Sequence, residues 1–102
     1  MGYARRRPKR LAEKLLQIRV ALGLSQSEMF RRLEVEEFSE IKRISDYEID
    51  KSEPPLIVLL QYARVAGVPT EVLIDDELDL PGKLPGPTNH EDIKRKFAPR
   101  RG

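Results

Sequence analysis

The sequence predicts an all-α fold, and three observations lead to this class. Apolar residues recur at intervals of three and four along much of residues 10–80, a spacing that places them on one face of a helix. Gly23, Ser25 and Gly67 stand at positions where helices would end or begin. The stretch 34–38 alternates acidic and apolar residues, but the chain offers no second strand with which it would pair. We therefore expect a compact bundle of five short helices.

The composition fits one small domain with a charged surface. The chain has 102 residues, of which 39% are hydrophobic and 35% charged, and it contains no cysteine. Disulfides and cysteine-ligated zinc are thereby excluded, and the interior of a cell is the expected location. The longest apolar run, residues 56–60, is far shorter than the roughly 18 residues that a membrane span needs, so we expect no membrane contact.

The net charge of +2 hides a strong segregation along the chain. Residues 1–10 carry five basic residues and no acidic one, whereas residues 34–53 carry eight acidic residues against three basic ones. Basic ends favour a polyanionic partner, although solubilising tails would have the same charge. We divide the chain into a flexible basic arm at 1–9, a helical domain at 10–80 and a Pro/Gly-rich basic tail at 81–102.

The first two helices are expected to meet at a short corner. The apolar residues of the first helix are spaced by four, three and four positions, at Leu11, Leu15, Ile18 and Leu22. Gly23 can adopt a positive φ without steric strain, so it ends this helix. Ser25 and Glu28 have the spacing of a capping box, in which each side chain bonds the backbone N–H of the other. The second helix is therefore predicted from Gln26 to Leu33.

The third helix follows a longer connection. Ser39 is its predicted N-cap, and Ile41 and Ile44 follow at helical spacing before the helix ends near Glu48. We interpret residues 34–38 as a loop or an extra helical turn.

Two further helices complete the predicted bundle. The fourth runs from Leu56 to Ala66 and stops at Gly67, and a short fifth helix follows at about residues 70–74. The inner face of the fourth helix is predicted to hold Leu56, Leu59, Leu60 and Ala63. Five of the seven residues at 81–87 are Pro or Gly, so the domain should end at Leu80. Beyond it, residues 93–97 allow one helical turn.

Several groups of residues carry a resemblance to a known family. They are Arg19 with Gly23-Leu24-Ser25-Gln26, then Ile44-Ser45-x-Tyr47-Glu48 with Pro54-Pro55-Leu56, then Leu59-Leu60-x-Tyr62-Ala63 leading to Gly67-Val68. Their order and spacing resemble the Cro/C1-type helix-turn-helix repressors, also called the XRE family, over Leu11 to about Leu80. The resemblance implies a lambda-repressor-like domain that binds double-stranded DNA as a homodimer and regulates transcription. It also implies a cytoplasmic, nucleoid-associated protein from a bacterial or phage-like context that uses no cofactor.

The resemblance also implies roles for particular residues. The family's glutamine that matches Gln26 bonds a DNA phosphate, and the residues that match Arg19 and Glu48 form an ion pair between the first and third helices. Base-reading side chains lie around the third helix, where Lys42 or Arg43 would donate to guanine. The predicted DNA-binding residues are Ser25, Gln26, Ile41, Lys42, Arg43, Ser45, Asp46 and Lys51, with Arg5, Arg6 and Arg7 of the basic arm.

The sequence departs from the family pattern near the corner. Eleven positions separate Leu33 from Ile44, which is four more than is usual in the family. Phe30 replaces a small residue, and Glu34 and Asp50 replace glycines. The acidic residues that would oppose phosphate binding near the third helix are Glu34, Glu36, Glu37, Glu40 and Asp46.

Two functions remain open from the sequence. One is a sequence-specific DNA-binding regulator, and the other is a protein-interaction adaptor or antitoxin-like module with the same fold. We do not expect an enzyme, because the chain shows no nucleophile with a base and no phosphate-cradling glycine loop. No metal site is expected either: His90 is the only histidine, and the acidic residues at 75–79 lack the pattern of a calcium loop, so they are interpreted as a solvated helix end.

Overall fold

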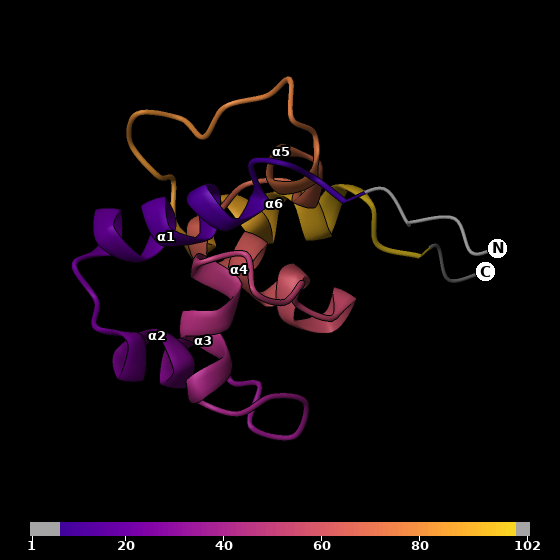
Figure 1. Ribbon diagram of the computed structural model, residues 1–102. Coiled ribbons are helices and arrows are strands. Elements are labelled where there is room, and N and C mark those ends of the chain that lie inside the picture. Colours follow the sequence, from indigo (N-terminus) through magenta and orange to yellow (C-terminus); the bar gives the residue numbers. More distant parts are fainter. Residues whose placement is uncertain (1–6, 100–102) are drawn as a thin grey trace, which may run out of the picture.

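The computed structural model describes residues 7–99, and within this range all regular secondary structure is helical. The helices are α1 (Leu11–Leu22), α2 (Gln26–Leu33), α3 (Lys42–Glu48), α4 (Leu56–Ala66), α5 (Thr70–Ile74) and α6 (Pro87–Lys96). Figure 1 shows α4 at the centre of the bundle, where it contacts α1, α2, α5 and α6. The predicted all-α class is confirmed. No helix in the described range is long and apolar enough to cross a membrane.

The corner between α1 and α2 has the predicted caps. Gly23 has a φ of 70°, and its N–H donates to the carbonyl of Val20 at 3.0 Å. The Ser25 hydroxyl accepts from the N–H of Glu28 at 3.1 Å, and the Glu28 carboxylate accepts from the N–H of Ser25 at 2.8 Å. These bonds from Ser25 lower the pKa of Glu28. The capping box therefore fixes where α2 begins.

The core lies between α4 and the helices around it. Its fully buried side chains include Leu15, Ile18, Met29, Leu33, Ile44, Tyr62 and Leu73. Phe30 is only partly buried and packs against this cluster. The prediction that Leu56 faces inward is wrong, because this first residue of α4 is 84% exposed. The buried face of α4 begins at Val58 and Leu59, so the first turn of the helix extends past the core.

The connection between α2 and α3 forms a turn around Val35. This side chain is buried, and its carbonyl accepts from the N–H groups of Phe38 at 2.8 Å and Ser39 at 2.9 Å. The predicted N-cap role of Ser39 is wrong, since α3 begins only at Lys42. The turn holds Ser39 ahead of the helix, and its hydroxyl bonds the hydroxyl of Tyr47 at 2.9 Å instead.

The acidic residues at 75–79 follow α5, and Glu77 and Asp79 are exposed, as expected for a solvated helix end, but Asp76 also bonds the backbone just ahead of α1. The Asp76 carboxylate accepts from the N–H groups of Lys9 and Arg10, each at 3.0 Å, and these bonds lower its pKa. The ammonium of buried Lys14 donates to the carbonyls of Val72 at 2.8 Å and Asp75 at 2.9 Å. This lysine thereby caps the C-terminal end of α5.

Helix α6 is longer than the single turn predicted at residues 93–97, and helical packing continues beyond Leu80. Its polar sequence buries no side chain fully, so apolar periodicity gave no signal for it. Hydrogen bonds to the C-terminal end of α4 hold it instead. The N–H of Gly86 donates to the Ala66 carbonyl at 3.0 Å, and the Asn89 amide donates to the Gly67 carbonyl at 2.6 Å. A Cβ at Gly67 would collide with the backbone of Gly86, so this contact requires glycine.

Two non-glycine residues of the described range, Glu34 (φ 55°) and Asp50 (φ 61°), adopt the left-handed conformation. This conformation costs residues other than glycine roughly 1–2 kcal/mol. A glycine avoids that cost, but it loses about 0.5–1 kcal/mol more than other residues in backbone entropy on folding. We therefore expect Glu34→Gly to raise the free energy of unfolding in urea by about 0.5 kcal/mol. Glu36→Gly, at a position without positive φ, is the control and should lower it. Equal losses of unfolding free energy in the two variants would contradict the conclusion that the backbone at Glu34 is strained.

The docking of α6 should depend on pH. Nε2 of His90 accepts from Nε of Arg64 at 3.3 Å, and burial, followed by the charge of Arg64, lowers the pKa of this histidine below 6.5. Lys94 lowers that pKa further, and Glu91 raises it. A lowered folded-state pKa means that stability is present above the unfolded-state pKa and is lost as the pH falls through the folded-state value.

We expect the melting temperature to fall between pH 7.5 and pH 5, with a smaller fall in His90→Gln. Circular dichroism measures both melting curves. An equal fall in the two proteins would show that His90 does not link α6 docking to pH.

Candidate nucleic-acid interface

A hydrogen-bonded network around Glu48 joins the first three helices. Arg19 of α1 donates from Nε to Glu48 Oε2 at 2.7 Å and from Nη2 to Oε1 at 3.1 Å. Its Nη1 also donates to the Leu24 carbonyl at 3.0 Å. The bond to Glu48 raises the pKa of Arg19. Because the Glu48 side chain is only 4% exposed, both of its oxygens need these donors. The structure thus contains the ion pair that the resemblance implies.

Gln26 and Ser25 take part in contacts within the protein. The Gln26 amide donates from Nε2 to Glu48 Oε1 at 3.1 Å, so it adds α2 to the network. The Ser25 hydroxyl accepts in the capping box and lies at the surface. The structure places both residues at the start of α2, where Ser25 caps this helix and Gln26 supports the position of α3.

The first turn of α3 faces solvent. Ile41 is 47% exposed, and the Lys42 and Arg43 side chains are 73% and 49% exposed. Both cations have carboxylate partners: Lys42 lies 3.3 Å from Glu40, and Arg43 lies 3.6 Å from Asp46. Exposed pairs of this kind contribute little to stability, so another anion can replace the carboxylate. The half-buried Ser45 follows on the same helix.

The basic arm and the loop after α3 are brought together. Arg7 donates from Nη2 to Asp50 at 2.9 Å, and its Nε lies 3.7 Å from Glu53. Lys51, on the same loop, is exposed, and its ammonium has no carboxylate partner within residues 7–99. Arg5 and Arg6 lie outside the described residues. Of the three predicted DNA-binding arginines of the arm, the structure describes Arg7, which lies against the acidic side chains of this loop.

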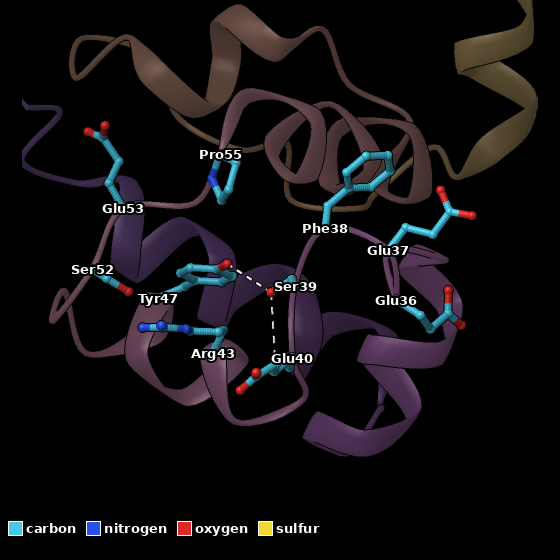
Figure 2. Close-up of a pocket in the computed structure, with 10 residues that line it drawn as sticks. All are labelled: Glu36, Glu37, Phe38, Ser39, Glu40, Arg43, Tyr47, Ser52, Glu53 and Pro55. Atoms are coloured by element: carbon cyan, nitrogen blue, oxygen red, sulfur yellow. Dashed lines mark hydrogen bonds between the residues drawn. The ribbon is translucent and has the colours of Figure 1, made fainter.

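An acidic groove lies beside α3 (Figure 2). It has a volume of about 510 Å³, and its lining includes four acidic residues, Glu36, Glu37, Glu40 and Glu53, against one basic residue, Arg43. Figure 2 shows Glu36 and Glu37 on one side of the groove and Glu53 on the other, with Arg43 and Tyr47 between them. Phe38, which is 54% exposed, adds an apolar surface. The sequence showed these acidic residues, but the groove exists only because the connection folds around Val35.

Comparisons of the chain with protein-family models, with curated proteins and with solved structures give no match. The resemblance to Cro/C1-type repressors therefore rests on the sequence residues that carry it. The first turn of α3 thus exposes two cations, Lys42 and Arg43, and the groove with four acidic residues lies beside it.

The network around Glu48 should dominate the stability of the bundle. Arg19→Ala leaves a buried carboxylate with Gln26 as its remaining side-chain donor, and removing one partner of a buried ion pair costs about 3–5 kcal/mol. We expect urea unfolding to show a loss of about 3 kcal/mol, since Arg19 is slightly exposed. Lys42→Ala, which removes an exposed pair, is the control and should change stability by less than about 0.5 kcal/mol. Similar losses in the two variants would contradict the role given to Glu48.

Proposed function

We propose that this protein is a sequence-specific regulator of transcription that binds double-stranded DNA with α3 in the major groove. The observation that carries the proposal is the network in which Arg19 and Gln26 hold Glu48. Glu48 is the last residue of α3, so the network anchors the C-terminal end of this helix and leaves its first turn exposed. In helix-turn-helix proteins, the N-terminal residues of the recognition helix are the ones that contact base edges.

Within this proposal the cations of α3 read bases. The guanidinium of Arg43 or the ammonium of Lys42 donates to O6 and N7 of guanine in place of the present carboxylates. Ile41 supplies an apolar contact, and Lys51 on the following loop binds a phosphate. Arg7 supports binding only after it leaves Asp50, so the basic arm contributes less affinity than its charge alone would suggest.

We further propose a cytoplasmic homodimer. Exposed apolar side chains outside the core support an interface between copies, among them Ile49, Leu56, Ile57 and Ile74. A two-fold dimer would place the two α3 helices about 34 Å apart and would read an inverted repeat.

The acidic groove favours a second candidate function, that of a protein-interaction module. Glu36 and Glu37, which have no cationic partner in the described range, repel phosphate, and exposed Phe38 and Ile41 give the same surface an apolar component. An adaptor or antitoxin-like protein would use such a surface for a protein partner.

The test compares Arg43→Ala with a matched control. A duplex that the full chain selects from a random pool is labelled, and binding is measured by fluorescence anisotropy. Loss of one base-reading arginine should weaken binding by about 1–3 kcal/mol, or roughly 5- to 150-fold, while the circular dichroism spectrum stays unchanged. Arg95→Ala removes an arginine in a similar pair, 3.4 Å from Asp92 on α6, and should bind within twofold of the parent.

A chain that selects no duplex, or an Arg43→Ala variant that binds as tightly as the parent, would contradict the proposal. In the first case the protein-interaction function becomes the better account.

A further inference from the structure

A second charged hollow lies between α2, α4 and α6. It shares no lining residue with the acidic groove. Its volume is about 320 Å³, and three helices each contribute a cation to its lining: Arg32 from α2, Arg64 from α4 and Lys94 from α6. Glu34 and Glu91 also line it, so the fixed charges of the hollow sum to one positive charge with His90 neutral. The residues of this hollow do not belong to the proposed DNA-reading turn of α3.

The cations of this hollow differ from those of α3 in having no carboxylate partner. Within residues 7–99, Arg32, Arg64 and Lys94 have no carboxylate oxygen within 4.0 Å, although two glutamates line the same space. Lys42 and Arg43 of α3 each have such a partner. The two glutamates of the lining leave one positive charge in excess, and an anion bound between the cations lowers their mutual repulsion.

Arg64 is held in a fixed position at the wall of the hollow. Its Nη1 donates to Gln61 Oε1 at 2.9 Å, and its Nε donates to His90 Nε2 at 3.3 Å. Gln61 is fixed in turn because its amide donates to the Leu33 carbonyl at 2.9 Å. Nη2 of Arg64 has no hydrogen-bond partner in the described part of the chain. A guanidinium that is already oriented loses less freedom when it binds an anion.

His90 supplies a donor that the protein leaves unsatisfied. Because Nε2 accepts from Arg64, the neutral ring carries its proton on Nδ1. Nδ1 is buried and has no hydrogen-bond partner among the described residues. Buried N–H groups in native proteins have partners as a rule, so this lining residue holds an unsatisfied polar atom just behind the wall of the hollow.

We infer that this hollow binds an oxyanion of the phosphate class. Arg64 and Lys94 hold its negative charge from α4 and α6, Arg32 approaches from α2, and an oxygen of the anion provides the acceptor that Nη2 of Arg64 lacks. The anion is either a free phosphate or a phosphodiester group of a nucleic-acid backbone. Its binding would tie α6 to α2 and α4. The inference does not depend on whether α3 reads DNA.

The test is an NMR titration of the full chain at pH 7 and constant ionic strength. Inorganic phosphate is added in one arm, sodium chloride in a second, and a short random-sequence DNA duplex in a third. We expect saturable amide shifts in α6 and the second half of α4 with phosphate or with the duplex, and none with chloride. Saturation by phosphate identifies a free anion as the ligand, and saturation by the duplex alone identifies the nucleic-acid backbone.

Variants on the rim of the hollow separate binding from folding. The double variant Arg32→Gln/Lys94→Gln removes two exposed cations. It should bind the ligand that gives saturable shifts at least tenfold more weakly, while its NMR spectrum remains that of a folded protein. Lys96→Gln, an exposed cation on α6 outside the hollow, is the matched control and should bind as the parent does. The inference is overturned if neither phosphate nor the duplex gives saturable shifts in α6, or if the double variant binds as tightly as the parent.

Discussion

The buried carboxylate of Glu48 is the group on which the arrangement of the first three helices depends. A charge removed from water is tolerated only with donors on its oxygens, and these come from Arg19 on α1 and Gln26 on α2. Helix α3 has seven residues and no side-chain N-cap, so its own backbone bonds are too few to fix it. Its direction is set at the Glu48 end, and the exposed turn at Ile41–Arg43 follows from that anchor.

The cations near α3 and those near α6 differ in whether they have carboxylate partners. The cations of α3 are paired with neighbouring carboxylates, so the proposed binding of DNA there would require an exchange of partners beside the acidic groove. The connection between α2 and α3 creates this situation, because it forms the turn around Val35 and brings Glu36 and Glu37 to the wall of the groove. The hollow between α2, α4 and α6 has the opposite property, since its three cations have no carboxylate partners in the described range. A polyanion therefore meets less competition at α6 than at α3.

The sequence predicted those features that depend on neighbours along the chain. Gly23 and the Ser25–Glu28 box act within one turn, and they placed the boundary between α1 and α2 correctly. Contacts between distant residues carried no such signal: the bond from Asn89 to Gly67 holds a polar helix that apolar periodicity does not reveal. Leu56 was misplaced because a helical period does not show where the core ends. At the site, the residues of the Arg19–Glu48 pair came from the family resemblance, whereas the pairing of Arg7 with Asp50 became visible only in the folded chain.

Protection of guanine N7 from dimethyl sulfate tests most directly whether α3 enters the major groove, because N7 lies on the major-groove edge of the base. The full chain would be bound to a duplex that it selects, and protection would be compared with that given by Arg43→Ala. The account predicts protected guanines in the parent complex and the loss of at least one of them in the variant. A bound complex in which every guanine N7 stays reactive would contradict it, because α3 would then lie outside the major groove.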